Sequence, residues 1–337
     1  MITYIVRRLL AAVLLLFVVS IVTFGIFFLI PRIAGATADD LASRYAGKTA
    51  DAETVHRIAL KLGFTDPLPV QYGRFVKAVF TGADYSTGPT VEHCPAPCLG
   101  YSFITQQPVW PDLLDRLPIT LSLALGAAVI WLLAGVGTGV LSALRKGSVF
   151  DRAAMSAALA GVSLPIFFTG LLSLSIFSYT LHWTVPGGTY INFKDNPFQW
   201  AHALLVPWIC LAFLYAAGYA RLTRAGMLET MGEDYIRTAR AKGLPERTVI
   251  AKHGLRAALT PILTIFGLDL GLLLGGAILT ESTFSLNGIG KYAVDAIKDN
   301  DLPKVLGVTL LAAVFIIIAN LVVDILYAVI DPRVRLT

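Results

Sequence analysis

One acidic residue lies deep inside an apolar stretch of this 337-residue chain, in TPILTIFGLDLGLLLGGAILT. A carboxylate in such a stretch is costly, and it usually faces a polar cavity or a partner. Asp269 is therefore expected either to line a path for a polar substrate or to make a structural hydrogen bond to a neighbouring helix. Leu273, Gly276 and Thr280 follow near the same side of a helix and are expected to continue that lining.

Two cysteines, Cys94 and Cys98, form the sequence CPAPC. A lone pair with this spacing and no second pair of ligands is weak evidence for zinc. An oxidising compartment would permit a disulfide between them, and we expect that bond instead of a metal site. The third cysteine, Cys210, lies in an apolar run and is expected to be a small core residue.

The sequence holds no motif for nucleotide hydrolysis or other catalysis. Gly47-Lys48-Thr49 resembles the end of a phosphate-binding loop, but Ala42 stands where its leading glycine is required. H-E-x-x-H and G-x-S-x-G are also absent from the sequence. We therefore expect no enzyme, no metal site and no directly bound cofactor.

A basic segment, EDYIRTARAKGLPERTVIAKHGLRAALTPIL, interrupts the apolar sequence between residues 233 and 263. Its spacing predicts a short helix over 235–242, ended by Gly243 and Pro245, and a second helix from about Glu246. Small residues, Ala239 and Gly243, would let another protein approach closely. The alternative is an amphipathic linker that lies on anionic lipid.

Composition places these features in a membrane. Hydrophobic residues make up 56% of the chain and charged residues only 15%, whereas a soluble protein has about 25% charged residues. Six apolar runs are long enough to cross a bilayer. They cover residues 9–30, 119–144, 153–181, 201–220, 257–279 and 305–330. The expected fold is an all-α polytopic membrane protein with six transmembrane helices, the first of them an uncleaved anchor.

Glycines in the second apolar run predict close packing between helices. Gly135, Gly137 and Gly139 follow one another at every second position. Small residues in a membrane helix let a neighbouring backbone approach closely. All three are therefore expected to mark helix contacts.

Basic residues predict the orientation of the chain. Lys and Arg are concentrated at 7–8, 145–152, 221–256 and 333–335, all on one side of the six spans. By the positive-inside rule, both termini and the loop 221–256 are cytoplasmic. The expected divisions are 1–30 (N-terminus and first span), 31–118 (a long extracytoplasmic loop), 119–330 (a five-helix core) and 331–337 (a cytoplasmic tail). Topology thus explains the net charge of +5, and no nucleic-acid partner is expected.

The long outer loop is expected to contain two amphipathic helices. In the first, Val55, Ile58, Ala59 and Leu62 share one face, and Gly63 ends the helix. In the second, the shared face is formed by Tyr72, Phe75, Val76 and Val79, and Gly82 ends the helix. They are expected either to cover neighbouring helices as a lid or to dock an external partner.

Several stretches resemble those of binding-protein-dependent ABC importer permeases, in the form found in peptide importers. They are RRLL, LGFTDPLPVQYGRFV, LPITLSLALGA, SLPIFFTGLL, DYIRTARAKGL with LRAALTPIL, ESTFSLNGIG and DPRVRL. Together they cover the chain nearly end to end. In the general loop pattern of the family, Ala239, Gly243 and Leu255 match and the other positions do not. Asn287 also departs, since the family usually has proline there.

The resemblance implies a type I ABC importer permease fold and a coupling helix that sits in a groove of an ATPase subunit. It assigns coupling to Asp234, Tyr235, Arg237, Thr238, Ala239, Gly243 and Leu255. Implied partners are a second permease, two ABC ATPases that bind ATP and Mg²⁺, an extracytoplasmic substrate-binding protein, a di- or oligopeptide and the lipid bilayer. The implied location is the bacterial inner or plasma membrane.

Other functions are consistent with parts of the sequence. The same family motifs occur in permeases for nickel or another small solute. A stand-alone secondary transporter could use Asp269 for proton coupling, but the chain has no obvious inverted repeat and the basic segment would remain unexplained. A membrane-embedded enzyme would need a catalytic constellation, which the sequence lacks.

Overall fold

The computed structural model describes residues 2–46, 51–86 and 91–330. The expected tail 331–337 and residues 47–49 lie outside this described part. The described residues form two compact units, in which distant parts of the sequence come together. Unit 1 contains the residues up to Thr120 and Asn287–Ile317, and unit 2 contains Leu121–Leu286 and the residues after Ile317.

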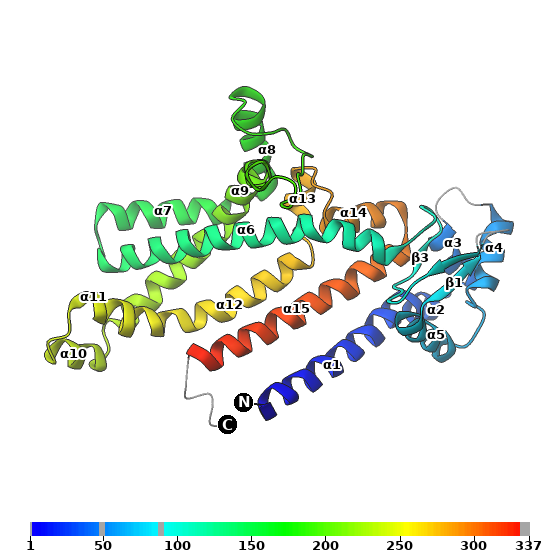
Figure 1. Cartoon of the computed structure of the whole chain (residues 1–337), viewed down its shortest axis with the longest axis horizontal. Coiled ribbons are helices and arrows are strands. Elements are labelled where there is room, and N and C mark those ends of the chain that lie inside the picture. Colours follow the sequence, from blue (N-terminus) through cyan, green and yellow to red (C-terminus); the bar gives the residue numbers. More distant parts are fainter. Residues whose placement is uncertain (1, 47–50, 87–90, 331–337) are drawn as a thin grey trace. The chain divides into compact units, whose positions relative to one another are not determined.

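Unit 1 is built from the long helix α1, several short helices, two small strand pairs and parts of two further long helices (Figure 1). Its helices are α1 (Ile2–Phe24), the π-helix η1 (Gly25–Leu29), α2 (Ile30–Ile33), α3 (Ala38–Ala46), α4 (Ala52–Lys61), α5 (Leu68–Thr81) and α14 (Ile289–Asp299). Its strands are β1 (Ala83–Ser86), β2 (Val91–Cys94), β3 (Tyr101–Ser102) and β4 (Gln107–Pro108), and β1 pairs with β2 and β3 with β4, both antiparallel. The starts of α6 (Val109–Leu144) and α15 (Leu302–Ile330) also belong to this unit.

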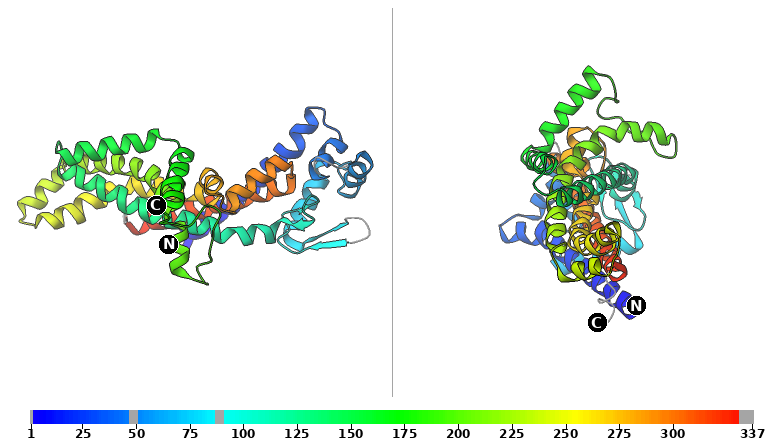
Figure 2. Two further views of the ribbon diagram at one scale, coloured as in Figure 1. Left: turned by 90° about the horizontal axis from the view of Figure 1, so that it is seen from above. Right: turned by 90° about the vertical axis from the view of Figure 1, so that its left-hand side faces the viewer.

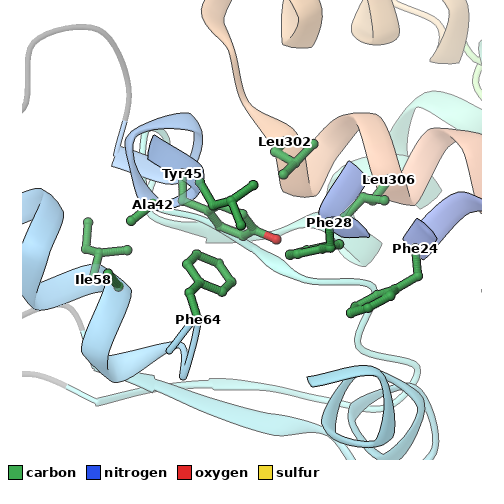
Figure 3. Packing of buried hydrophobic residues seen from close by; sticks show 10 residues of the cluster. Phe24, Phe28, Ala42, Tyr45, Ile58, Phe64, Leu302 and Leu306 are labelled. Atoms are coloured by element: carbon green, nitrogen blue, oxygen red, sulfur yellow. The ribbon is translucent and has the colours of Figure 1, made fainter. Parts of the chain in front are cut away.

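One buried cluster of unit 1 contains several contacts between aromatic rings. Phe24 and Phe28 stack on each other with ring centroids 4.4 Å apart, and Tyr45 packs on Phe64 at 5.1 Å. Leu302 from α15 joins this core, so residues far apart in the sequence bury one another (Figure 3). The apolar face of the outer segment is thus covered by the chain itself.

Both predicted outer helices are confirmed. Helix α4 buries Ile58 and Ala59, and α5 ends at Gly82, whose φ of 77° suits glycine. Helix α3 and the strand pairs were not predicted, because short polar segments carry little periodic signal. Helix α6 begins at Val109, so the end of the expected loop 31–118 is already helical.

Buried polar contacts hold β3 against the start of α15 in unit 1. Ser102 Oγ donates a hydrogen bond to Asp301 Oδ2 at 2.5 Å, and Lys304 Nζ lies 3.2 Å from the same carboxylate oxygen. Asp301 is 1% exposed, so its charge needs both partners. Both electrostatic and apolar contacts therefore hold the segment before α6 against the start of α15.

Unit 2 is helical (Figure 1). After α6 it contains α7 (Val149–Ser163), α8 (Ile166–Ser173), the π-helix η2 (Leu174–Thr180), α9 (Pro197–Thr230), α10 (Asp234–Ala241), α11 (Glu246–Thr248), the π-helix η3 (Val249–Leu255), α12 (Arg256–Leu274) and α13 (Ile278–Thr283). Helix α9 packs extensively against α7, α8 and α12. It is the central element of this unit.

Five helices of the described residues are long and apolar enough to cross a membrane, and a bent pair would make a sixth. The pair is Val149–Ser163 with Ile166–Thr180, bent by 101°. The third predicted span over 153–181 is therefore not one straight helix. Pro165 explains the bend, because proline disfavours helical geometry at the residue before it, and Leu164 is extended with φ −88° and ψ 126°.

Two other predicted span ends also differ from the structure. Helix α9 continues to Thr230, beyond the expected end at 220, because Arg221 and Arg224 end the apolar run without ending the helix. Helix α12 stops at Leu274 instead of 279, where Gly275 caps it and Gly276 adopts a φ of 130°. The polar boundary of a span and the end of its helix are thus separate features.

Glycines allow close helix contacts within unit 2. A Cβ atom on Gly139 would lie 2.5 Å from Thr223 Cβ of α9, and one on Gly267 would lie 1.9 Å from Val323 Cγ2 of α15. Gly135 meets α9 in the same way, as predicted. Gly137 does not, because nothing lies within 4 Å of its Cβ position, and the prediction that it marks close packing is wrong.

Candidate functional site

The basic segment forms a compact bend at one end of unit 2, next to the ends of α9 and α12 (Figures 1 and 2). We call residues 233–255 the elbow. Glu233 is extended before α10, and Gly243, with φ 76°, and Pro245 separate α10 from α11. The predicted helix–turn–helix arrangement is confirmed. It leads through η3 directly into α12.

The inner face of the elbow is a small apolar core. Ile236 and Val249 are completely buried and Ala239 is 7% exposed, and all three pack together with Met231. Ile236 and Ala239 are three residues apart and so share one face of α10. Ala239 therefore faces the chain's own core, which corrects the expectation that its small side chain leaves room for another protein.

The outer face of α10 is polar and exposed. Asp234, Tyr235, Arg237 and Thr238 all lie outside the apolar core. Arg237 Nη1 lies 3.2 Å from Asp234 Oδ1, and Thr238 Oγ1 donates to the Asp234 carbonyl at 3.0 Å. Partial burial and then Glu233 raise the pKa of Tyr235, so its phenol is neutral near pH 7 and can donate a hydrogen bond. This face can therefore offer donors, a cation and an aromatic ring to a partner.

An ion pair braces the turn of the elbow. Arg240 Nη2 lies 2.7 Å from Glu246 Oε1, and Arg240 Nε donates to Glu246 Oε2 at 3.1 Å. Such a two-pronged geometry fixes the relative direction of α10 and α11 better than a single contact. Because both side chains are substantially exposed, we assign this pair a role in geometry and not a large stabilising energy.

The far end of the elbow is anchored on α9. Leu255 packs on the buried cluster of Ala143, Met227 and Ala258. Gly254 is buried there, and a Cβ on it would lie 2.9 Å from Met231 Sδ. The role of Gly254 was not predicted, although a glycine in an otherwise helical segment is a signal of close approach. Leu255 is thus an internal anchor of the elbow.

A second electrostatic contact near the elbow was also not predicted. Arg224 of α9 donates from Nε to Asp151 Oδ1 at 2.6 Å and from Nη2 to Asp151 Oδ2 at 2.8 Å. The Asp151 side chain is 5% exposed and also accepts from the Gly147 backbone N–H at 2.9 Å. The position of Asp151 at the start of α7 gives no sign of a partner 73 residues away.

Asp269 lies on α12 and accepts a hydrogen bond from Tyr219 Oη of α9 at 2.8 Å. Nearby, Trp131 is completely buried and stacks on Tyr215 with ring centroids 4.7 Å apart. The carboxylate is only partly buried. The expected structural hydrogen bond to a neighbouring helix is therefore present, and the same carboxylate also retains some exposure.

The three residues expected to continue the lining from Asp269 do not share one helix. Leu273 is buried near the end of α12, Gly276 lies in the break after it, and Thr280 is 2% exposed in α13. The break at Gly275 and Gly276 changes the chain direction, so helical spacing no longer relates these positions. The structure thus places Asp269 and Leu273 together on α12 and separates Gly276 and Thr280 from them.

Cys94 and Cys98 are joined by a disulfide in unit 1, with Cα atoms 5.6 Å apart, and both residues are completely buried. Cys210 is a free, buried thiol. Among the described residues, no group of three or more His, Cys, Asp or Glu side chains is arranged to hold a metal ion.

Known proteins resemble the chain along its whole length. The family model "Binding-protein-dependent transport system inner membrane component" matches residues 135–336, and the model of the corresponding N-terminal membrane component matches 1–124. The di/tripeptide transport system permease DppB of Pseudomonas aeruginosa is 38% identical over 354 residues, covering 99% of both chains. The dipeptide permease DppB of Escherichia coli K12 is 35% identical, with 99% of both chains covered.

A third relative is the glutathione transport system permease GsiC of Escherichia coli O6:H1, which is 34% identical over 335 residues and 99% of both chains. All three similarities extend through both units and include the elbow. The chain therefore belongs to the family of binding-protein-dependent transport system inner membrane components, and it is a multi-pass transport subunit of an ABC importer, not an enzyme.

Proposed function

We propose that this chain is one of two permease subunits that form the translocation pathway of an ATP-driven importer of short peptides. Its partners are a related permease, two ABC ATPases and an external substrate-binding protein. Two of the relatives named above are permeases for di- or tripeptides, and the third is a permease for glutathione. Both termini and the elbow lie in the cytoplasm, as the distribution of Lys and Arg predicts.

The elbow is the observation that carries this proposal. A partner that binds the exposed face of α10 would push on a body held together by Ile236, Ala239 and Val249. Because η3 leads without interruption into α12, and Leu255 packs beside α9, a displacement of α10 reaches both long helices. We assign the outward contact to Asp234, Tyr235, Arg237 and Thr238, and the internal geometry to Ala239, Gly243 and Leu255.

Alternating access follows from this arrangement. ATP binding closes the two ATPases, the elbows of the paired permeases move together, and the pathway opens to receive a peptide from the binding protein. Hydrolysis then returns the pathway to its inward-facing state. ATP and Mg²⁺ act on the ATPase subunits, and the residues of this chain transmit motion.

Asp269 is the residue that we place on the pathway, with Leu273 beside it. Its carboxylate is partly exposed, and the hydrogen bond from Tyr219 fixes its position. An oriented carboxylate can attract the ammonium group of a peptide during passage. Gly276 permits the break that follows α12, and Thr280 lies in the next short helix.

Reconstitution tests the proposal. The chain is co-expressed with the related permease and the ATPases, and uptake of labelled dipeptide into proteoliposomes is measured with its binding protein and ATP. ATP-dependent uptake supports the proposal. Uptake by this chain alone without ATP, or uptake of nickel but not of peptide, would contradict it.

A further inference from the structure

Helix α5 lies beside the C-terminal end of α1 (Figure 1). Tyr72 packs on Phe24 with ring centroids 5.3 Å apart, and its Oη lies 2.8 Å from Ser20 Oγ. Because α1 continues through η1 and α2 to Ile33, α5 packs against the side of this long helix and not against its end. The face of α5 opposite to Tyr72 therefore points sideways, away from α1.

The register along α1 gives the depth of α5 in the bilayer. The apolar span begins at Leu9. Ser20 is 11 residues beyond Leu9 and Arg32 is 23 residues beyond it, which at 1.5 Å per residue is about 17 Å and about 35 Å along the helix. Tyr72 reaches Ser20, whereas Arg32 Nη1 donates to the Asp66 carbonyl, just before α5, at 3.4 Å. Since the hydrocarbon layer is about 30 Å thick, α5 lies at its far edge.

The side chains of α5 change in polarity across this edge. Toward the centre of the bilayer, on the side of Tyr72, the helix carries Val76 and Phe80 at a spacing of four residues. Toward the aqueous side it carries Arg74, whose Nη1 lies 2.7 Å from Asp66 Oδ2. An apolar side that faces the acyl chains and a polar side that faces water are typical of a helix lying in the plane of a membrane surface.

The exposed side chains of α5 fit the two layers that meet at this edge. Phe80 is 77% exposed and Val70 is 45% exposed. At this depth both side chains meet acyl chains, where an exposed apolar surface carries no cost of hydration. Lys77 is exposed and has no ion-pair partner among the residues that the structure describes. A lysine at such a boundary extends its ammonium group to the headgroup layer while its stem stays on apolar surface.

We propose that α5 is a membrane-surface anchor whose partner is the lipid of the outer leaflet. Phe80 and Val70 lie among the acyl chains, and Lys77 binds lipid phosphate, with a preference for anionic headgroups. The anchor goes beyond the proposed function, from which it takes only the orientation of α1. It holds the first span and the segment around α5 at a fixed depth in the bilayer.

Fluorescence quenching tests this placement. In nanodiscs that hold the assembled transporter with Cys210→Ala, Phe80→Cys is labelled with bimane. Quenching by lipids brominated on their acyl chains is then compared with quenching by aqueous iodide. Val13→Cys, at an exposed position within the first span, is the lipid reference, and Glu53→Cys, exposed on α4, is the aqueous reference.

Position 80 should be quenched more by brominated lipid than by iodide, as at position 13. Stronger quenching by iodide, as at position 53, or protection from both quenchers by a protein partner, overturns the proposal. Co-purification with the ATPases checks assembly. If Phe80→Cys does not assemble, Val70→Cys on the exposed side of the same helix takes its place and the same two results decide.

Lys77→Gln tests the phosphate contact separately. With brominated phosphatidylglycerol as the minor lipid in phosphatidylcholine, loss of this charge should lower the lipid quenching at position 80 that reports local enrichment, by a factor of about two to five in enrichment. Arg57→Gln is the matched control, because Arg57 is exposed on α4 and its loss removes the same charge from unit 1. It should leave the enrichment unchanged. Equal loss in both variants, or no loss in either, overturns the role of Lys77.

Discussion

Arg224 and Asp151 form a two-pronged ion pair that joins α9 to the start of α7, with N–O distances of 2.6 and 2.8 Å. The carboxylate is nearly inaccessible and the guanidinium is 26% exposed. The same α9 carries Met227, which belongs to the buried cluster on which Leu255 of the elbow packs. The pair therefore fixes the helix through which we propose that the elbow acts.

Removal of one partner from this pair should destabilise the protein. In Arg224→Gln the largely buried Asp151 carboxylate loses its charged partner. It keeps the Gly147 backbone N–H and gains at most a neutral amide donor from the new glutamine. We expect the thermal unfolding midpoint of the purified transporter to fall by several degrees. Arg221→Gln, at an exposed position one turn earlier on α9, should change it little. Equal midpoints for the two variants would show that the pair has no stabilising role.

Gly139 and Gly137 provide a matched test of close packing between α6 and α9. Gly139→Ala would place Cβ 2.6 Å from the Ala220 carbonyl oxygen and should destabilise by about 1–3 kcal/mol through overpacking. Gly137→Ala meets nothing within 4 Å and should be neutral or stabilising by about 0.5–1 kcal/mol, because alanine favours helix. Unfolding in mixed micelles measures both. Equal effects would contradict the close contact between these two helices.

Gly243 tests the geometry of the elbow. Its φ of 76° is strained for a β-branched residue. No atom lies within 4 Å of the position that a Cβ would take, so only the backbone conformation opposes a side chain there. Gly243→Val should cost about 1–2 kcal/mol locally and reduce ATP-driven uptake more than ATPase activity. Gly243→Asn should retain more uptake, because asparagine tolerates this backbone region. If valine and asparagine behave alike, backbone conformation at this position does not matter for coupling.

Variants of Asp269 and Tyr219 distinguish a role of Asp269 in the pathway from a purely structural role. Asp269→Asn keeps an acceptor for Tyr219 Oη but removes the charge, whereas Tyr219→Phe keeps the charge and removes the hydrogen bond. A pathway role predicts that Asp269→Asn lowers peptide uptake more than Tyr219→Phe, at similar protein stability. Uptake that is intact in Asp269→Asn over the full range of peptides would contradict that role.

Periodic apolar spacing predicted much of this fold. The positions of α4 and α5 could be read from their apolar faces, and the turn of the elbow from Gly243 and Pro245. These features are local, so the sequence around each of them contains the necessary information. The disulfide between Cys94 and Cys98 was also predicted, because their loop was expected in an oxidising compartment and no second pair of zinc ligands follows.

Features that depend on distant partners could not be predicted. Pro165 was visible, but a proline in a membrane helix can be accommodated, and a 101° bend depends on what surrounds it. The sequence around Asp151 does not indicate its ion pair with Arg224. Ala239 was expected to be accessible to another protein, but in the structure it packs on Ile236 and Val249. Tertiary packing determines this bend, this ion pair and this burial, and local sequence patterns do not encode which distant segments pack together.

Cysteine crosslinking tests the central claim that the elbow seats in an ATPase subunit. In the assembled transporter with Cys210→Ala, Arg237→Cys or Thr238→Cys is labelled with a maleimide that carries a photoreactive benzophenone, and the complex is illuminated, with Lys194→Cys as the control on the expected outer side. We predict a covalent adduct between this chain and an ATPase from positions 237 and 238, changing in yield with ATP, and none from position 194. No ATPase adduct from either elbow position in any nucleotide state, in a complex that still co-purifies with its ATPases, would contradict the claim.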